Sequence, residues 1–223
     1  MMIVGISGFS GSGKTTIANY LTARHGFVRL CFASAVKDVV AASFGWDRQW
    51  LEGGTPEHRT WREVPDPFWS ELLERPITPR YALQYIGTDV FREIVHPDIW
   101  AHIIIAKIRQ MGPDAKVVID DVRFRNERRV LQKAGANFVT VFRPGPEHKH
   151  LTPVHGDIWT QAFSLPPGEE LAVAGGWEEL HPSEWDWLMD PNVRNTPILM
   201  NDQTITALWG TIDSWYTTIM RGV

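Results

Sequence analysis

The residues from Gly8 to Thr15 carry the clearest chemical pattern in the chain. They fit G-x-x-x-x-G-K-[ST], a loop whose glycines let successive backbone N–H groups turn toward one phosphate-sized concavity. Lys14 is then placed to reach the β and γ phosphates, and the Thr15 hydroxyl to ligate Mg²⁺. The pattern predicts a site for ATP or GTP formed by Gly8, Ser10, Gly11, Ser12, Gly13, Lys14, Thr15 and Thr16.

The segments on either side of this loop have the order that the motif requires. Residues 3–6 form a short apolar run typical of a buried strand, and Ile17, Ala18 and Leu21 give the following segment helical periodicity. A helix beginning near Gly13 would direct the positive end of its dipole at the bound phosphates. Strand, loop and helix therefore favour a functional phosphate loop over a chance match.

A second polar site follows the apolar run at residues 117–119, which ends in Asp120 and Asp121. A carboxylate at the end of a strand beside the phosphate loop can hold a Mg²⁺-bound water. We assign Asp120 to this position and, with Thr15, to the metal site. Asp121 is the alternative, and either residue could instead cap the following turn.

Four arginines lie directly downstream of the acidic pair, at positions 123, 125, 128 and 129. Transfer of a phosphoryl group between two anions needs fixed cations that neutralise its equatorial oxygens. We therefore take Arg123 and Arg125, together with Lys14 and Asp120, as candidate catalytic residues. Helical geometry turns only some of the four inward, so Arg128 or Arg129 is expected to be solvated.

Hydrophobic periodicity and turn signals give a coarse secondary structure for the rest of the chain. The expected strands span residues 27–32, 116–119, 137–142 and 197–200. The expected helices span residues 33–44, 69–73, 79–95, 98–111, 126–134 and 203–220. Residues 45–67 are expected to form a loop excursion, and the proline-rich residues 143–184 an irregular insertion.

Composition limits the classes of function. The chain has 22 Lys and Arg against 26 Asp and Glu, so no net positive charge favours a stable nucleic-acid partner. The single cysteine, Cys31, is expected in a buried strand and favours a reducing cytoplasm. No apolar stretch approaches the 18 or so residues that cross a bilayer, so neither membrane insertion nor secretion is expected.

Several motifs make the chain resemble the bacteriophage-type deoxynucleoside monophosphate kinases. Residues 121–127 resemble that family's D-V-R-F-x-N-E signature, residues 32–37 its F-A-x-x-x-K segment, and residues 83–92 its L-Q-x-x-G-T-D-x-x-R segment. Residues 181–184 are similar to its H-x-S-E, and residues 198–202 to its final strand, which ends in N-D or N-N. The likeness covers nearly the whole chain, although residues 143–180 depart in length and composition.

The resemblance implies an α/β fold: a three-layer P-loop kinase domain, residues 1–223, with a five-stranded parallel sheet flanked by helices. Residues 45–112 would be its helical substrate-binding insertion. The implied reaction transfers the ATP γ-phosphoryl group to a deoxynucleoside monophosphate, with ATP and Mg²⁺ as cofactors. Small-molecule nucleotides are then the expected partners, in the host cytoplasm if the chain is phage-encoded; a homodimer is left open.

The chemistry of a monophosphate acceptor agrees with this implication, because its oxyanion is nucleophilic at neutral pH and needs no general base. Lys37, Arg80 and Arg92 are candidates for holding the acceptor phosphate, and Gln84 and Asp89 for hydrogen bonds to base or sugar. Each has a structural alternative: Lys37 as a solvated helix residue, the arginines in ion pairs, and Gln84 as a cap.

Two other functions remain open from sequence. A kinase of a hydroxyl acceptor would need an acid to orient that hydroxyl, and Asp38 is the residue to inspect. A nucleotide-dependent switch would have no acceptor, but the N-K-x-D-like run of GTPase switches is missing. His148, His150, His155 and Asp157 match no standard zinc spacing, which disfavours a functional metal there.

Overall fold

A computed structural model describes residues 1–143 and 186–221 of the chain. These residues divide into two compact units, one formed by residues 1–30 with the described residues from 108 onward, and one by residues 31–107. The irregular insertion predicted at 143–184, with its histidines, falls outside the described residues apart from Arg143. Single-domain organisation stays a prediction.

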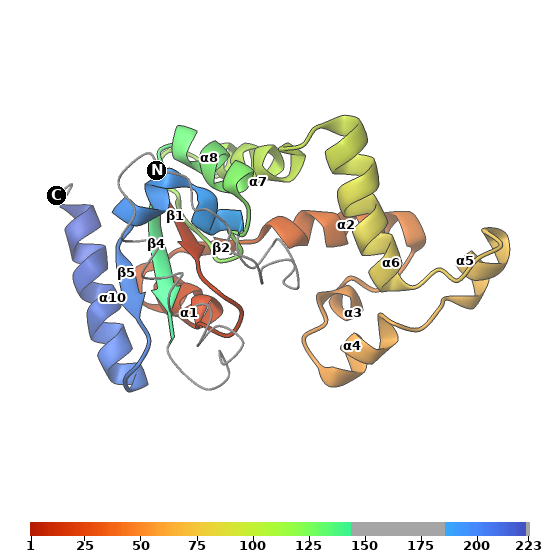
Figure 1. Cartoon of the computed structure of the whole chain (residues 1–223), viewed down its shortest axis with the longest axis horizontal. Helices are drawn as coiled ribbons and strands as arrows, with labels where there is room; N and C mark the ends of the chain where they lie inside the picture. The colour runs from red at the N-terminus through yellow and green to blue at the C-terminus, as the bar shows by residue number, and fades with distance from the viewer. Residues whose placement is uncertain (144–185, 222–223) are drawn as a thin grey trace. The chain divides into compact units, whose positions relative to one another are not determined.

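The first unit contains a five-stranded, wholly parallel sheet (Figure 1). Its strands, in spatial order, are β2 (Val28–Leu30), β3 (Lys116–Ile119), β1 (Met2–Ser7), β4 (Asn137–Phe142) and β5 (Ile198–Met200). Parallel neighbours require long crossover connections, which place helices against the faces of the sheet. The predicted α/β fold with a five-stranded parallel sheet is confirmed.

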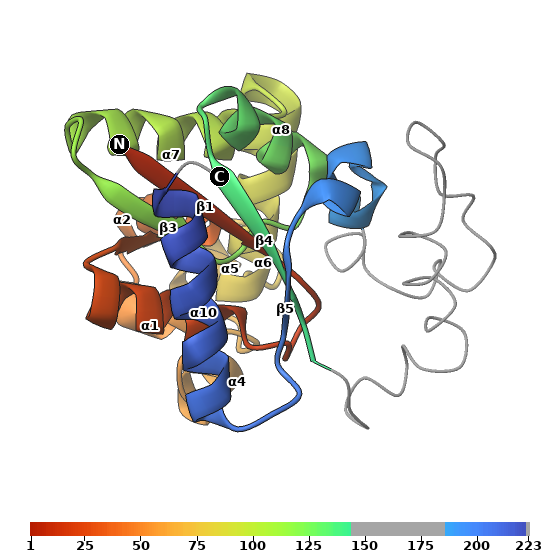
Figure 2. The same ribbon diagram turned by 90° about the vertical axis from the view of Figure 1, so that its left-hand side faces the viewer.

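One face of this sheet is covered by α1 (Lys14–His25) and α10 (Ile205–Met220). α10 lies in front of the strands in Figure 2. Ile17 and Leu21 of α1 and Ile212 of α10 are completely buried against the central strands. Each fully buried side chain of this size contributes roughly 1.5–3 kcal/mol. The phosphate loop is therefore attached at both ends to the best-packed part of the unit.

The opposite face carries α8 (Arg125–Lys133), which follows β3 and precedes β4. Gly5 of β1 lets the ring of Phe138 in β4 pack directly against the β1 backbone, since a Cβ atom at Gly5 would lie 2.6 Å from that ring. Two short 3₁₀ helices, η4 (Asp186–Met189) and η5 (Pro191–Asn195), lead into β5. This gives the expected helix–sheet–helix layering.

The second unit is helical. It comprises α2 (Phe32–Phe44), α3 (Arg48–Glu52), α4 (Pro56–Trp61), α5 (Pro67–Leu72), α6 (Pro79–Gln84), η1 (Tyr85–Val95) and most of α7 (Ile99–Gln110). Trp46 stacks on Phe44 with ring centroids 4.5 Å apart and meets Trp61 edge-on at 6.0 Å. Large aromatic side chains thus supply the packing that these short helices need.

The loop expected at residues 45–67 is wrong, because that stretch contains α3 and α4 and the start of α5. The helices are short enough to hide their periodicity, yet each has a capping side chain: Asp47, Thr55 and Asp66 accept hydrogen bonds from backbone N–H groups one turn ahead. Proline at the first helical position of α4 and α5 supports the same starts.

Two other predicted elements need correction. The strand expected at 27–32 is shorter, since Cys31 already precedes α2, and it is not buried: Val28 is 47% exposed. The helix expected at 79–95 is α-helical only to Gln84 and continues as a π-helix, η1. Wider π turns shift the register of all later side chains.

Among the helices of residues 1–143 and 186–221, none is both long and apolar enough to cross a bilayer.

Candidate active site

The loop between β1 and α1 has the backbone shape that its glycines predict. Gly8, Gly11 and Gly13 have φ values of +146°, +74° and +104°, a region that other residues rarely adopt. Space is also restricted, because a Cβ atom at Gly8 would lie 2.4 Å from the carbonyl oxygen of Val141. The first turn of α1 thus begins directly at the concave side of the loop.

Lys14 bends back over the loop that precedes it. Its Nζ donates hydrogen bonds to the carbonyl oxygens of Gly8, at 2.7 Å, and Phe9, at 2.6 Å. These contacts hold the ammonium at the loop, where a phosphate oxygen could replace a carbonyl as its acceptor.

The loop also receives a hydrogen bond from the residue that follows the edge strand β5. Asn201, directly after β5, donates a 2.9 Å hydrogen bond from Nδ2 to the carbonyl oxygen of Ser12. A Cβ atom at Gly13 would lie 2.5 Å from the same nitrogen, so the glycine is needed for this approach. The contact gives a physical role to Asn201 within the resembling segment 198–202.

Thr15 and Asp120 meet as the metal prediction requires. The Thr15 hydroxyl donates to Asp120 Oδ2 at 2.8 Å, and Asp120 is only 4% exposed. Asp121 is partly exposed. Two oxygen donors side by side at the phosphate loop suit a hard divalent cation such as Mg²⁺. The geometry favours Asp120 over Asp121.

Sequence reasoning missed Arg29, the main cationic partner of Asp120. Its Nε donates to Asp120 Oδ1 at 2.9 Å, and one terminal nitrogen lies 2.8 Å from Oδ2. Such a two-pronged pair fixes the plane of the carboxylate. Arg29 lies in β2 and Asp120 after β3, so the parallel pairing of Leu30 with Ile119 was the signal that could have found it.

A cavity of about 460 Å³ opens beside the phosphate loop. Its walls come from the loop and α1, from Arg143 after β4, and from the segment after β5. The lining residues are Gly11, Gly13, Lys14, Thr15, Thr16, Arg143, Asn201, Gln203 and Ile205. An apolar side chain, an amide and a cationic side chain beside a phosphate loop are a suitable environment for the rest of a nucleotide.

The arginines after Asp121 have different environments. Arg123 is exposed, and its backbone N–H donates to Glu127 Oε2 at 2.9 Å, as does that of Phe124 at 3.1 Å. The buried side chain of Glu127 thus caps the N-terminus of α8. Arg125 instead meets Asp186 of η4 twice, through its backbone N–H at 2.7 Å and its Nε at 3.2 Å.

Arg128 is buried and Arg129 exposed, so only Arg129 has the solvated position expected for one of them. The Nε of Arg128 lies 3.0 Å from Asp190 Oδ2, and its guanidinium lies over Phe138, 4.1 Å from the ring centroid. Burial lowers the pKa of Arg128 to about 10, against the attraction of Asp190. It remains charged near neutral pH and ties α8 to η5.

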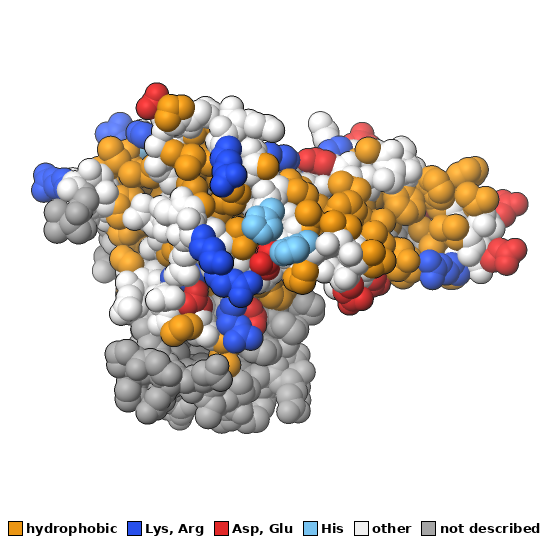
Figure 3. Space-filling model, turned by 90° about the horizontal axis from the view of Figure 1, so that it is seen from above, with side chains coloured by type: hydrophobic (Ala, Val, Ile, Leu, Met, Phe, Trp, Pro, Cys, Tyr) orange, Lys and Arg blue, Asp and Glu red, His pale blue; other side chains and the backbone are white. Residues whose placement is uncertain are grey.

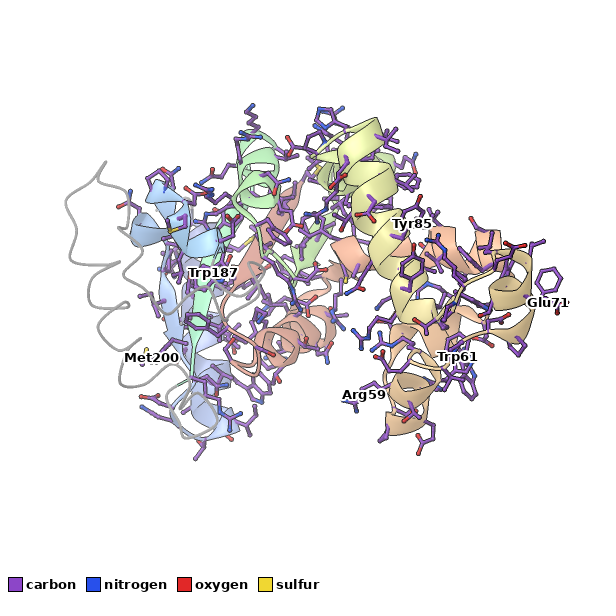
Figure 4. All side chains as sticks on the ribbon, turned by 45° about the vertical axis from the view of Figure 1, so that its right-hand side comes forward. Arg59, Trp61, Glu71, Tyr85, Trp187 and Met200 are labelled. Atoms are coloured by element: carbon purple, nitrogen blue, oxygen red, sulfur yellow. The ribbon has the colours of Figure 1, made fainter. Side chains whose placement is uncertain are left out.

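The phosphate loop also contacts the segment before β5. Phe9 packs edge-on against Trp187 of η4, with ring centroids 5.6 Å apart, and both side chains are buried. Trp187 is labelled in Figure 4. Arg125 reaches Asp186, the residue before Trp187. Residues 186–190 therefore support both the loop and the start of α8.

The candidate acceptor residues all lie in the second unit. Lys37 is partly buried and forms a 2.8 Å ion pair with Glu52, so it is not a freely solvated residue. Arg80 pairs with Glu63, not with Glu93 or Asp89. Arg92 is partly buried, and Gln84 and Asp89 are exposed near the junction of α6 and η1 and within η1. Their substrate roles stay predictions.

Asp38, the acid that a hydroxyl-acceptor kinase would use, is held by cations. It accepts from Arg48 Nε at 2.7 Å, and Lys107 Nζ lies 3.6 Å from its other oxygen. Arg48 also contacts Glu52, whose pKa is lowered by hydrogen bonds from Lys37 and Arg48 against the opposing effect of burial. The carboxylate of Asp38 is thus already engaged by cationic side chains.

Known proteins with related sequences share one description. A family model described as deoxynucleotide monophosphate kinase matches residues 69–155. A provisionally named deoxynucleotide monophosphate kinase of Acanthamoeba polyphaga mimivirus is 36% identical over 155 residues, which cover 65% of this chain and 76% of the viral protein. The deoxynucleoside-5'-monophosphate kinase of Escherichia phage T5 is 44% identical over 57 residues, 26% of this chain and 22% of its own.

Solved structures add little. TT1252 from Thermus thermophilus has a TM-score of 0.48 at 14% identity, with 97% of each chain covered. That score is too low to carry an argument, so the fold rests on the strand order and the phosphate loop described above.

Proposed function

This chain belongs to the deoxynucleotide monophosphate kinase family, and we propose that it transfers the γ-phosphoryl group of ATP to a deoxynucleoside 5'-monophosphate. The products would be ADP and the deoxynucleoside diphosphate, a precursor for DNA synthesis. In this step an oxygen of the acceptor phosphate bonds to the γ-phosphorus. The bond from that phosphorus to the β–γ bridging oxygen breaks, and its electron pair leaves with ADP.

The observation that carries the proposal is the contact between Thr15 and Asp120 at an intact phosphate loop. The hydroxyl and the carboxylate are the oxygen donors that would hold Mg²⁺, which neutralises charge on the β and γ phosphates when bound. Arg29 fixes the carboxylate through contacts to both of its oxygens. Lys14 would exchange its carbonyl acceptors for phosphate oxygens when ATP is present.

The remaining roles follow from charge and exposure. Arg123 is an exposed arginine two residues after Asp121, and we assign it to stabilising the phosphoryl group in the transition state. Arg125 belongs to the same candidate pair, although Asp186 already holds its guanidinium. Lys37 and Arg92 are assigned to the acceptor phosphate, and Gln84 and Asp89 to its base or sugar, because these residues lie in the segments that resemble the family. Arg80, which lies just before the segment 83–92, is assigned to the acceptor phosphate for its charge.

The family-model match supports the same acceptor class. Residues 69–155 include two of the resembling segments, 83–92 and 121–127. The pairing of Asp38 with Arg48 and Lys107 supplies no free acid for a hydroxyl acceptor. Catalysis would therefore rely on cationic side chains and on the positioning of the two substrates. An acceptor phosphate needs no more than this, because it is already an oxyanion. Nucleotides are the proposed partners and the cytoplasm the proposed location.

The test is ADP release from ATP and Mg²⁺ with each of dAMP, dCMP, dGMP and dTMP, and with the corresponding ribonucleotides. Stimulation by at least one deoxynucleotide is expected, and Lys14→Ala serves as the blank because removal of its ammonium should abolish transfer. Lys133→Ala, at the exposed end of α8, is the matched control. ATP binding without stimulation by any monophosphate would overturn the proposal.

A further inference from the structure

Two histidines and an aspartate converge where η1 ends and α7 begins. His96 is the residue after η1, Asp98 directly precedes α7, and His102 lies one turn into α7. One potential ligand atom from each of the three lies within 4.8 Å of the others. His96 and His102 face each other with ring centroids 5.5 Å apart and planes at 69°. Adjacent histidines on the surface are visible in Figure 3.

The backbone holds these three residues in one compact turn. The N–H of His96 donates to Phe91 O, that of Ile99 to His96 O, and that of His102 to Asp98 O, all at 3.0 Å. Pro97, between His96 and Asp98, further restricts the turn. The three side chains therefore leave a short, constrained stretch on the same side, and ordering them around a ligand costs little backbone entropy.

The spacing fits a transition metal better than Mg²⁺. A tetrahedral Zn²⁺ with bonds of about 2.0–2.1 Å to nitrogen and oxygen holds its ligand atoms about 3.4 Å apart. His96 and His102 are exposed and Asp98 partly so, and small side-chain rotations would close the difference. Two imidazoles and one carboxylate are ligands that Zn²⁺ accepts, whereas Mg²⁺ prefers an all-oxygen shell.

One existing contact must change when a metal binds. His96 Nδ1 lies 3.0 Å from the backbone N–H of Asp98 and accepts its proton. A metal on Nδ1 would replace that hydrogen bond, and a metal on Nε2 would require Nδ1 to carry the proton and lose it. This hydrogen bond lies at the surface, so water can replace the imidazole as acceptor of the released N–H.

We propose that His96, Asp98 and His102 form a Zn²⁺ site, with a fourth position left for water. The site is separate from the Mg²⁺ site assigned to Thr15 and Asp120 and does not depend on the proposed kinase reaction. Bound Zn²⁺ would tie the end of η1 to the first turn of α7. Since η1 carries Asp89 and Arg92, the ion would restrict the end of the helix that presents them.

The experiment titrates Zn²⁺ into the whole chain by calorimetry, with Mg²⁺ in excess and no nucleotide present. His102→Gln and His96→Gln should each bind about one Zn²⁺ fewer than the unsubstituted chain. Co²⁺ supplies a second readout, because its visible absorption reports nitrogen and oxygen ligands in a tetrahedral field. That absorption should be lost in both variants.

The matched control carries Gln at His148, His150 and His155 together, and it should keep both the binding event and the Co²⁺ spectrum. Far-UV circular dichroism without metal checks the fold of each variant, and Asp98→Asn provides a third test with almost unchanged shape. Equal Zn²⁺ stoichiometry and affinity in His96→Gln, His102→Gln and the unsubstituted chain would overturn the proposal. Loss of binding in the triple variant alone would do the same.

Discussion

The Thr15 hydroxyl donates to the Asp120 carboxylate across a sequence separation of 105 residues, at 2.8 Å. This contact joins the first turn of α1 to the end of β3, the two places where a phosphate-loop enzyme needs oxygen ligands. It depends on β1 and β3 being direct neighbours, paired from Met2 with Lys116 to Gly5 with Ile119. The sheet order thus places the two oxygen donors together.

Asp120→Asn should raise the Mg²⁺ concentration needed for half-maximal activity and lower kcat. The amide keeps the size of the side chain but removes the charge that attracts the cation. Thr15→Ser should stay close to normal, because it retains the hydroxyl, whereas Thr15→Val should behave like Asp120→Asn. Mg²⁺ titrations at saturating ATP make the comparison, and an unchanged Mg²⁺ requirement in Asp120→Asn would remove Asp120 from the metal site.

Arg123→Ala should lower kcat by about 10²-fold with little change in KM if its guanidinium acts only in the transition state. Arg129→Ala, on the exposed side of α8, the helix that follows Arg123, is the control and should be near normal. Steady-state kinetics with a saturating deoxynucleotide measure both parameters. A rise in KM at constant kcat would instead make Arg123 a ground-state binding residue.

Arg125→Ala and Asp186→Asn separate catalysis from support. If Arg125 mainly anchors η4, both variants should lose similar activity and stability, because each removes the ion pair between the two side chains while the backbone N–H of residue 125 can still donate to residue 186. If its charge stabilises the transferred group, Arg125→Ala should lower kcat well beyond Asp186→Asn. The ratio of the two kcat values decides between these roles.

Asp190→Ala should destabilise the fold by about 3–5 kcal/mol, because it leaves the buried guanidinium of Arg128 without a counterion. Replacing both residues together, as Arg128→Met with Asp190→Leu, should cost less than the sum of the single changes. Urea unfolding measures each variant, with Asp114→Ala on the surface as the control. Strict additivity would mean that the pair does not act as a unit.

Acid should weaken the packing of α10 on α1 through Asp213. Hydrogen bonds from His25, at 2.7 Å, and Tyr20, at 3.0 Å, lower the pKa of the Asp213 carboxyl, with His25 the larger cause. A carboxyl with a lower pKa in the folded chain stabilises the fold above its unfolded pKa of about 4 and loses this effect as the pH falls. The Tm of Asp213→Asn should therefore fall less steeply below pH 4 than that of the unsubstituted chain.

Local sequence patterns predicted the phosphate loop and the strands at 116–119 and 137–142, because a glycine motif and unbroken apolar runs fix such elements without distant contacts. The short helices α3 and α4 were missed for the opposite reason. Their stability comes from caps such as Asp47 and from packing among Trp46, Trp61 and Phe44. Periodicity over five or six residues cannot report that packing.

Long-range polar contacts were the other limit of prediction. Arg29 stands in a short strand and gives no sign of its pairing with Asp120, 91 positions later. Likewise, Arg125 and Arg128 had the right residue type for catalysis, yet Asp186 and Asp190 hold them. Charge can be read from a sequence, but whether that charge faces a substrate or a buried partner depends on the completed fold.

The hydrogen bond from Asn201 to Ser12 has a consequence for how the site comes into being during translation. The glycine loop leaves the ribosome well before the amide that holds it, because Asn201 is synthesised 189 residues after Ser12. β1 likewise pairs with β3 and β4, which are both synthesised after it. A nascent chain that stops before β5 would carry the complete loop sequence without this hydrogen bond, so nucleotide affinity should rise once β5 and Asn201 have been synthesised.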